Sequence, residues 1–371
     1  MARSLSAPVL IVGGGPAGLA TAAALSMRGI AYRVVERGPI LGHMWRNAYD
    51  SLTLHTGRHM SGLPGMGFAA GTPLFPTKDQ FWSYLTAYAE RYAITVETDC
   101  EVRSIMPGSN GWMAETATSI VHTPHVVIAT GIMSNPQTPD IPGRTRFTGR
   151  VMHSVEYRRP SDFVGQRVLV IGVGNSGGEI ASELGHAGVD VTIAVRSGAN
   201  VVPRQIAGVP IQYIAYGLRT LPLGAREWIA DVVQNVSAMK RGAPVFPRAR
   251  TSALESVPLI GFHLVDAIRA GIVQLKLTGV AEFTAGGIRF ADNSERPYDV
   301  VILATGFASA LGPLGDLVRR DAKGFALRSD RVTSADQSSL YFVGSNYDAT
   351  GGLANIRTDA MLVAERIART N

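Results

Sequence analysis

Two glycine motifs contain the residues of this sequence whose types and spacing best suit the binding of a phosphate-containing ligand. GGGPAG at residues 13–18 follows the apolar run VLIV, and GVGNSG at residues 172–177 follows RVLVI. In such a motif the first glycine forms a tight turn, the second lets the backbone approach a pyrophosphate, and the third lets the helix pack closely on the strand. The start of the following helix offers free N–H groups and a partial positive charge to the phosphates. Each motif therefore predicts a dinucleotide site.

The two motifs belong to an internal repeat with an offset of 159 residues. The offset superposes Gly13 on Gly172, Gly15 on Gly174, Gly18 on Gly177, Ala22 on Ala181, Leu25 on Leu184 and Gly29 on Gly188. Each copy has the pattern of a strand, a glycine turn, a helix, a turn and a second strand. Ordinary βαβ turns without a ligand are the alternative. Two motifs that both lie between a β-rich run and a helical run favour two binding sites.

The copies differ at the end of the second strand, where cofactor specificity is set. Glu36 follows one strand, and a carboxylate there can bind both ribose hydroxyls, which suits FAD or NAD. Arg196 follows the other strand, where its guanidinium can pair with a 2′-phosphate and Ser197 can add a hydrogen bond. A surface arginine is the alternative reading of Arg196. We predict FAD at the first site and NADPH at the second, with a hydride passing from nicotinamide to flavin.

Two similar strands indicate how the domains are connected. HVVIATG at residues 125–131 and DVVILATGF at residues 299–307 both end in small residues, which suit backbone that lies close to a ligand or a neighbouring domain. We expect an α/β fold with two Rossmann-like domains, the NADPH-binding domain being inserted into the FAD-binding domain. The expected FAD domain comprises residues 1–150 and 305–371, and the expected NADPH domain residues 155–300.

Three further segments carry structural signals. Thr77 is a good N-cap for a core helix whose apolar face carries Phe81, Leu85, Tyr88 and Tyr92. Residues 211–255 are expected to form an irregular, helical, lid-like insert; a lid or substrate mouth is preferred over a dimer contact or a membrane-surface helix. The C-terminal run predicts a strand, a glycine loop and a helix. The N-terminus of that helix, near Gly352 and Leu353, would face the flavin.

Composition excludes several classes of protein. The formal net charge is +6, but the basic residues are scattered, so no nucleic-acid partner is expected. No metal site or membrane span is predicted, and the N-terminal apolar run is read as a glycine motif, not a signal peptide. A cytoplasmic enzyme, with a homodimer left open, is the expectation. Cys100 is the single cysteine, so a redox-active disulfide pair, and with it a flavin disulfide reductase, is excluded.

A third motif connects the chain to a known family. The stretch FTGRVMHSVEYR at residues 147–158 lies between the two glycine motifs, and LATGF follows at residues 303–307. This order resembles the class B flavin-dependent monooxygenases, which carry FxGxxxHxxxY followed by Arg or Lys. The match gives Phe147, Gly149, His153, Tyr157 and Arg158. The basic residue after the tyrosine is similar to the flavin-containing monooxygenase branch, and the whole chain resembles its YUCCA-type members.

The resemblance implies a chemistry. In that family FAD and NADPH occupy two Rossmann-like domains, reduced flavin adds O₂ at C4a, and bound NADP⁺ guards the adduct. The resulting flavin C4a-(hydro)peroxide would insert one oxygen atom into a small organic substrate. We rank S- or N-oxygenation first and Baeyer–Villiger or 2-keto-acid (indole-pyruvate-type) oxidation second. An uncoupled NADPH oxidase is a further alternative.

His55 marks a departure from the family pattern. Many members place an asparagine beside the flavin in the stretch that aligns with SLTLHT, and here His55 stands in its place. A neutral imidazole can donate one hydrogen bond, so His55 is the candidate catalytic residue. A structural contact with FAD and an ordinary polar loop position are the alternatives. His153 is expected to organise the linker between the domains and the grip on NADP⁺.

The full prediction of cofactor contacts follows from the motifs and from the resemblance. The residues are Gly13, Gly15, Pro16, Ala17, Gly18, Glu36, Arg37, Met44, Trp45, His55, Val102, Thr130, Gly131, Gly172, Gly174, Asn175, Ser176, Gly177, Arg196, Ser197, Thr305, Gly306 and Leu353.

Overall fold

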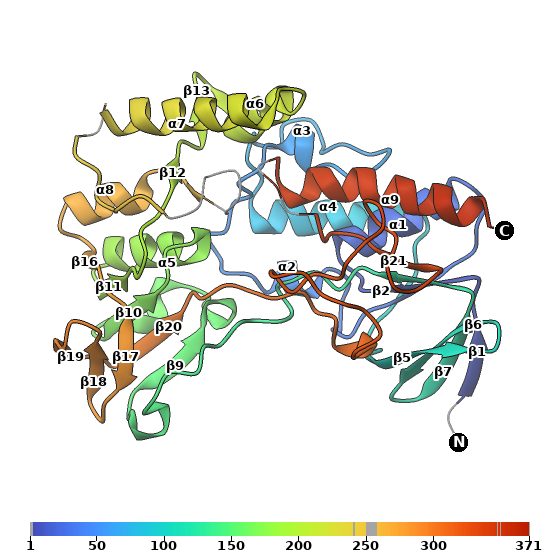
Figure 1. The fold of residues 1–371 in the computed structure, drawn as a ribbon, viewed down its shortest axis with the longest axis horizontal. Coiled ribbons are helices and arrows are strands. Elements are labelled where there is room, and N and C mark those ends of the chain that lie inside the picture. The colour runs from blue at the N-terminus through green and yellow to red at the C-terminus, as the bar shows by residue number, and fades with distance from the viewer. Residues whose placement is uncertain (1–2, 240–241, 250–257, 347, 349, 371) are drawn as a thin grey trace. The chain divides into compact units, whose positions relative to one another are not determined.

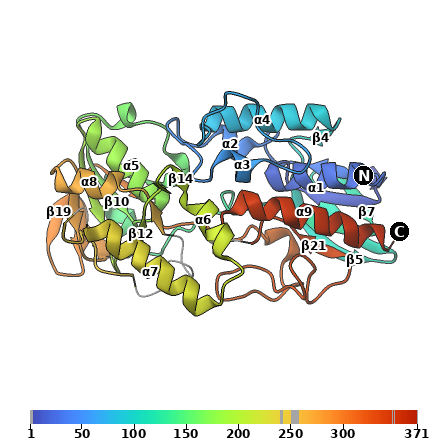
Figure 2. The same ribbon diagram turned by 90° about the horizontal axis from the view of Figure 1, so that it is seen from above.

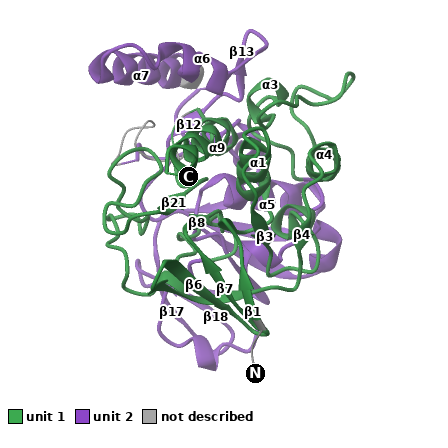
Figure 3. Ribbon diagram, turned by 90° about the vertical axis from the view of Figure 1, so that its right-hand side faces the viewer, with its two compact units in different colours: residues 1–47, 52–135, 307–371 green, residues 48–51, 136–306 purple. Residues whose placement is uncertain are grey.

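The structure is a computed structural model, and it describes residues 3–239, 242–249, 258–346, 348 and 350–370. The chain forms two compact units (Figure 3). Unit 1 comprises residues 1–47, 52–135 and 307–371, and unit 2 comprises residues 48–51 and 136–306. Among the described residues, no helix is long and apolar enough to cross a membrane.

Unit 1 is built on a five-stranded parallel sheet of order β21-β8-β2-β3-β4. Its strands are β2 (Val9–Val12), β3 (Arg33–Val35), β4 (Val96–Glu97), β8 (His125–Ile128) and β21 (Leu340–Phe342). A second sheet of order β1-β7-β6-β5 contains β1 (Arg3–Ser6), β5 (Val102–Gly108), β6 (Gly111–Thr116) and β7 (Ser119–Thr123). The helices are α1 (Pro16–Ser26), α2 (His43–Arg46), α3 (Arg58–Ser61), α4 (Lys78–Arg91) and α9 (Gly352–Ala368), with a 3₁₀ turn η4 (Gly312–Leu314).

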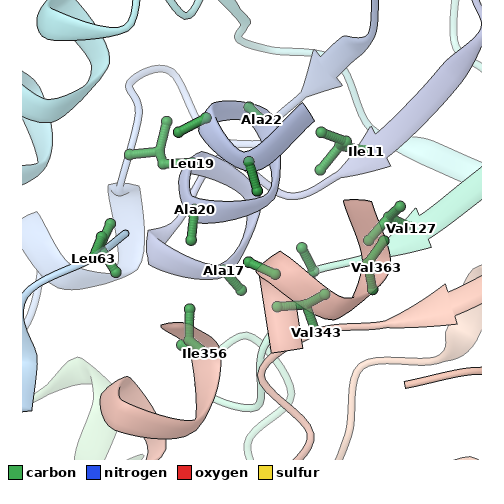
Figure 4. Packing of buried hydrophobic residues seen from close by; sticks show 14 of the residues in the cluster. Ile11, Ala17, Leu19, Ala20, Ala22, Leu63, Val127, Val343, Ile356 and Val363 are labelled. Atoms are coloured by element: carbon green, nitrogen blue, oxygen red, sulfur yellow. The ribbon is translucent and has the colours of Figure 1, made fainter. Parts of the chain in front are cut away.

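Strand β2 divides its side chains between two cores of unit 1. Because successive side chains of a strand point to opposite faces, Val9 and Ile11 pack into the core formed with α1, α4 and α9. Leu10 and Val12 enter the other core, which also receives side chains from the second sheet. Helices α1 and α9 run side by side in this unit (Figure 2). Figure 4 shows side chains of α1 and α9 gathered beside the sheet strands.

Unit 2 repeats this plan. Its parallel sheet has the order β16-β11-β10-β20-β9 (Figure 1). The strands are β9 (Arg150–His153), β10 (Arg167–Ile171), β11 (Asp190–Ala194), β16 (Gln274–Lys276) and β20 (Val300–Leu303). An antiparallel sheet comprises β17 (Val280–Phe283), β18 (Gly287–Phe290) and β19 (Glu295–Pro297). In both units the strand before the glycine loop pairs with the strand that ends in ATG, so the structure confirms the predicted repeat.

Unit 2 also contains shorter elements. Its helices are α5 (Asn175–His186), α6 (Ile211–Leu218), α7 (Leu223–Met239) and α8 (His263–Arg269). The short strands are β12 (Val201–Val202), β13 (Gln205–Ile206), β14 (Val209–Pro210) and β15 (Leu259–Ile260), and the 3₁₀ turns are η1 (Arg144–Arg146), η2 (Ser154–Glu156) and η3 (Pro160–Phe163).

The unit boundaries differ from the expected domain boundaries. Residues 136–150 and 305–306, which are expected in the FAD domain, group with unit 2. The reason is pairing: β9 adds to the edge of the unit 2 sheet beside β20, and Phe147 packs against Phe283 with ring centroids 5.4 Å apart. Residues 48–51 also group with unit 2, which the sequence did not indicate.

The insert at residues 211–255 is helical, as expected, and its lid role stays a prediction. Most of its described part is regular, because α6 and α7 occupy residues 211–218 and 223–239. Residues 240–241 and 250–255 lie outside the described residues. The core helix with Thr77 as N-cap is also confirmed: Thr77 and Gln80 form a reciprocal capping box at the start of α4.

Candidate functional site

The first glycine loop lies between β2 and α1, and each glycine has a distinct steric reason. Gly13 has φ +116°, and a Cβ there would lie 2.4 Å from the Ala129 carbonyl oxygen. A Cβ on Gly18 would lie 1.8 Å from the Gly13 carbonyl oxygen. Gly15 is different, because nothing lies within 4 Å of its Cβ position. A side chain is therefore excluded at Gly13 and Gly18, where the chain packs on itself. The space beside Gly15 is open, and a phosphate could approach the backbone there.

The second glycine loop, between β10 and α5, repeats this geometry. Gly172 has φ +108°, and its Cβ would lie 2.4 Å from the Ala304 carbonyl oxygen. The Cβ of a residue at Gly177 would lie 2.1 Å from the Gly172 carbonyl oxygen, whereas Gly174 again has nothing within 4 Å. Ala129 and Ala304 are the alanines of the two ATG turns. Each ATG turn thus packs against a glycine loop, which explains why it uses small residues.

Both helices begin without a side-chain cap. In the described structure, α1 starts at the N-cap Gly15 and α5 at the N-cap Gly174, with neither a capping side chain nor an acidic residue in the first turn. The first N–H groups of a helix have no partner within the helix, and the helix dipole adds positive potential there. Two open glycines at two uncapped helix starts fit two dinucleotide pyrophosphates.

Glu36 is held beside the first glycine loop. Its Oε2 accepts a hydrogen bond from the Gly14 amide at 2.8 Å, and its Oε1 accepts one from the Gly38 amide at 2.8 Å. Each carboxylate oxygen has a second acceptor site, so these bonds orient the group and leave capacity for ribose hydroxyls. The geometry fits the predicted adenosine contact.

Arg196 stands in the corresponding place in unit 2, after β11. It is exposed, and its Cγ would lie 3.5 Å from a Cβ on Gly279. In the described part of the chain no carboxylate forms an ion pair with Arg196. The adjoining Ser197 is also exposed. An unpaired guanidinium beside a hydroxyl group suits a phosphate monoester.

Asn175 uses its side chain within the protein. Its Nδ2 donates to the Pro258 carbonyl at 3.2 Å, and its Oδ1 accepts from the Ile260 amide at 2.8 Å. The predicted cofactor contact of Asn175 can therefore come from its main-chain N–H, while the amide side chain fixes β15 beside the glycine loop. Ser176, the next residue, is partly buried.

The motif at residues 147–158 packs closely against other parts of unit 2 and has a structural role. A Cβ on Gly149 would lie 2.5 Å from the Asp299 carbonyl oxygen, which excludes larger residues. His153 is 4% exposed; its Nε2 donates to the Gly306 carbonyl at 3.1 Å, and its Nδ1 accepts from the Val155 amide at 3.2 Å. This pattern requires a neutral ring, and burial lowers the pKa of His153. His153 thus fixes the second ATG turn, in line with the expected linker role.

The end of this motif joins a buried hydroxyl–carboxyl network that sequence reasoning missed. Tyr157 is fully buried and donates to the Glu183 carboxyl at 3.0 Å. Tyr49 donates to the Glu179 carboxyl and lies 6.2 Å from the Tyr157 ring. Burial raises the pKa of Glu179 and, together with the neighbouring carboxyls, the pKa of Tyr49. Residues 48–51 are held in unit 2 by this network and by a bond from the Asp50 amide to the Arg158 carbonyl at 2.9 Å.

His55 lies next to the start of α9. It is partly buried between two buried residues, Leu54 and Thr56. A Cβ on Gly351, the N-cap of α9, would lie 2.8 Å from the Thr56 Oγ1. The structure therefore brings the predicted His55 and Leu353 segments together within unit 1. The catalytic role of His55 stays a prediction.

Four other predicted contacts lie in the two ATG turns. Thr130 Oγ1 donates to the Ala310 carbonyl at 2.8 Å, and Thr305 Oγ1 donates to the Gln137 carbonyl at 2.5 Å. Gly131 and Gly306, which follow these threonines, have φ values of +65° and +89°. These bonds fix the two ATG turns that support the glycine loops.

The remaining predicted contacts are mostly packed into unit 1. The Trp45 ring packs edge-on against Phe81 with centroids 4.6 Å apart, and Met44 is partly buried. Arg37 donates to the Ser134 carbonyl at 3.0 Å. The buried members are Pro16, Ala17, Val102 and Leu353. A cofactor contact from these buried residues would use main-chain atoms or a small part of the side chain.

Similarity to known proteins adds independent information. Residues 10–206 match the family model described as pyridine nucleotide-disulphide oxidoreductase. The chain is 33% identical to indole-3-pyruvate monooxygenase YUCCA1 of Oryza sativa subsp. japonica, covering 96% of this chain and 90% of the relative. It is also 33% identical to indole-3-pyruvate monooxygenase YUCCA8 of Oryza sativa subsp. indica, covering 97% and 90%.

Solved structures agree in fold. The structure is similar to a flavin-containing monooxygenase from Stenotrophomonas maltophilia, with a TM-score of 0.78, 22% identity and 99% coverage of both chains. A closed crystal structure of cyclohexanone monooxygenase gives a TM-score of 0.77 at 18% identity, covering 99% of this chain and 85% of that chain. At these identities the likeness supports the fold alone.

Proposed function

Because this chain belongs to the pyridine nucleotide-disulphide oxidoreductase family and, within it, to the YUCCA-like class B flavin-dependent monooxygenases, we propose that it oxidises an aromatic 2-oxo acid at the carbonyl carbon. The enzyme uses FAD and NADPH. The observation that carries the proposal is 33% identity over nearly the whole chain with relatives named as indole-3-pyruvate monooxygenases. This reverses the ranking from sequence, in which sulfur or nitrogen oxidation comes first.

The residues that would hold the cofactors follow from the two loops. The open backbone at Gly15 and the carboxylate of Glu36 would hold FAD, and the open backbone at Gly174 with Arg196 and Ser197 would hold NADPH. When both are bound, NADPH supplies a hydride to FAD, and the reduced flavin reacts with O₂. The protein's own residues orient the two cofactors and exclude water from the reacting atoms.

The overall conversion balances without further reactants. One oxygen atom enters at the carbonyl carbon of R–CO–COOH, and the bond from that carbon to the carboxyl group breaks. The products are R–COOH and CO₂, while the second oxygen atom leaves as water with two electrons from NADPH and two protons, one from NADPH and one from solvent. The substrate carboxylate is therefore the leaving group and must be bound in a defined orientation.

Disulfide reduction is a poor alternative for this chain, although its family name includes that activity. Cys100 is the single cysteine, and burial raises the pKa of its thiol. A dithiol–disulfide exchange needs a second cysteine and a reactive thiolate.

The test is a product analysis on the FAD-loaded protein with NADPH and O₂. The substrates are indole-3-pyruvate, phenylpyruvate, methyl phenyl sulfide and N,N-dimethylaniline. We expect the one-carbon-shorter acid and CO₂ in equal amounts from the 2-oxo acids. Sulfoxide or N-oxide as the main product would overturn the proposal in favour of S- or N-oxygenation. Peroxide equal to the NADPH consumed with every substrate would indicate an oxidase.

A further inference from the structure

Unit 1 contains a cavity of about 420 Å³ that the predicted cofactor contacts do not use. It is lined by the chain between Arg58 and Ala70 and by Arg357 of α9. Sites for small organic molecules commonly have volumes of roughly 300–1,000 Å³ and mainly apolar walls with a few polar groups. This cavity lies within that range of volumes, and its wall combines the apolar side chains of Leu63, Met66 and Phe68 with the polar side chains of Arg58, His59 and Arg357.

The apolar wall of the cavity is fixed from behind by α4. Phe68 stacks on Tyr84 with ring centroids 4.2 Å apart. The Tyr84 hydroxyl donates to the Met66 carbonyl at 2.8 Å and accepts from the Leu63 amide at 2.7 Å. Tyr88 donates to the Pro64 carbonyl at 2.8 Å. The loop is therefore held in one conformation before any ligand binds, which reduces the entropic cost of binding.

Two arginines add positive charge to this wall. Arg357 donates from Nε and Nη2 to the Gly62 carbonyl at 3.0 and 2.7 Å, and from Nη2 to the His59 carbonyl at 3.0 Å. Arg58 donates from Nη1 to the Thr72 carbonyl and from Nε to the His59 ring at 3.4 Å. Within the described residues, Nη1 of Arg357 and Nη2 of Arg58 donate no hydrogen bond.

The two charges are not neutralised inside the protein. In the described part of the chain neither Arg58 nor Arg357 forms an ion pair. Asp359, the buried carboxylate on α9, is bonded to Arg331 and Asn346 instead. Two partly buried guanidinium groups, each with one Nη group that donates no hydrogen bond, favour an anion, and charge-assisted hydrogen bonds from these groups suit a carboxylate.

We propose that this cavity binds an aromatic monocarboxylate, with Arg58 and Arg357 on the carboxylate and with Leu63, Met66 and Phe68 against the ring. Resting on the proposed function, the ligand is the 2-oxo acid substrate itself. The arginines then set specificity for acids over neutral carbonyl compounds.

The experiment is a calorimetric titration of the oxidised, FAD-loaded protein without NADPH, so that no turnover occurs. The probes are phenylpyruvate and its uncharged methyl ester. Arg58→Gln and Arg357→Gln should each weaken phenylpyruvate binding by about 10-fold or more, or ~1.4 kcal/mol, and leave ester binding within about twofold. Arg357→Lys should recover part of the acid preference. Arg103→Gln, at an exposed arginine of β5 outside the cavity, is the matched control and should change neither.

Each other outcome overturns the proposal. These outcomes are wild-type protein that binds neither probe, equal loss of acid and ester binding, and acid binding unchanged in both glutamine variants. Thermal unfolding of each variant checks the fold, and Arg58→Gln serves if Arg357→Gln does not fold.

The result also separates this site from the proposed function. Arginine-dependent binding of phenylpyruvate without formation of the shortened acid would keep the site and remove the function. Product formation with the same KM in all variants would keep the function and remove the site.

Discussion

At the end of β11, Arg196 is exposed beside Ser197, and its aliphatic part lies against Gly279. If this guanidinium binds the 2′-phosphate, Arg196→Ala should raise the Kd for NADPH by about 10-fold or more, because charge-assisted hydrogen bonds contribute roughly 1.5–3 kcal/mol. The Kd for NADH should stay unchanged. Fluorescence titration with both nucleotides measures this. An equal loss for both would contradict the assignment, and Arg103→Ala is the control.

His153 is a second single residue with a testable effect: it should make the free energy of unfolding depend on pH. Burial lowers its pKa in the folded protein, whereas in the unfolded chain it stays near the usual value of about 6.5. The unfolded state therefore binds the proton more readily, and the stability that His153 contributes is present above about pH 6.5 and lost as the pH falls below it. His153→Gln keeps a donor for the Gly306 carbonyl but cannot titrate.

Urea unfolding at a series of pH values tests this prediction. The free energy of unfolding of the wild type should fall more steeply between about pH 7 and about pH 5.5 than that of His153→Gln. Parallel curves would show that His153 does not titrate differently in the folded protein.

Among the structural elements, the second glycine loop contains one glycine that should matter for nucleotide binding and one that should matter for stability. A Cβ on Gly174 meets nothing within 4 Å, whereas one on Gly177 would lie 2.1 Å from the Gly172 carbonyl oxygen. Gly174→Ala should therefore leave the unfolding temperature nearly unchanged while weakening NADPH binding. Gly177→Ala should lower the unfolding temperature, because the helix must move off its strand. Melting curves and nucleotide titrations of the pair measure both effects, and a reversed pattern would refute the loop geometry.

The segment of residues 48–51 can be tested through the hydrogen bond that Tyr49 makes. Tyr49→Phe removes the donor to the Glu179 carboxyl and leaves that group without this partner. The expected loss is about 0.5–1.5 kcal/mol in the free energy of unfolding, the net contribution of a typical intramolecular hydrogen bond. Chemical unfolding of the FAD-loaded variant measures it. A change below about 0.5 kcal/mol would mean that the contact contributes little to stability.

Local features of these elements could be predicted from the sequence, whereas contacts between distant residues could not. The strand, glycine turn and helix of each copy are predictable, because periodicity and glycine spacing are local signals. The contacts between Tyr49 and Glu179, and between Asn175 and Ile260, join residues far apart in the sequence, and polar residue types alone do not predict such pairs. The boundary at residue 135 escapes prediction for the same reason, since β9 joins its sheet through a strand 150 residues later.

For the whole molecule, the repeat explains the fold and most of the candidate site. Each unit has a five-stranded parallel sheet, a smaller sheet that contains antiparallel strand pairs, and a glycine loop with an open second glycine. Glu36 and Arg196 then differentiate the two copies. The cavity at residues 58–70 lies outside this repeat, and its arginines could be read from the sequence only as scattered basic residues.

The most direct test of the account is the anaerobic mixing of FAD-loaded protein with one equivalent of NADPH in a stopped-flow instrument. We predict rapid bleaching of the visible flavin absorbance with NADPH, much slower bleaching with NADH at the same concentration, and the loss of this difference in Arg196→Ala. A flavin that stays oxidised in the presence of NADPH would contradict the proposal that NADPH, bound at the second glycine loop, reduces the FAD bound at the first.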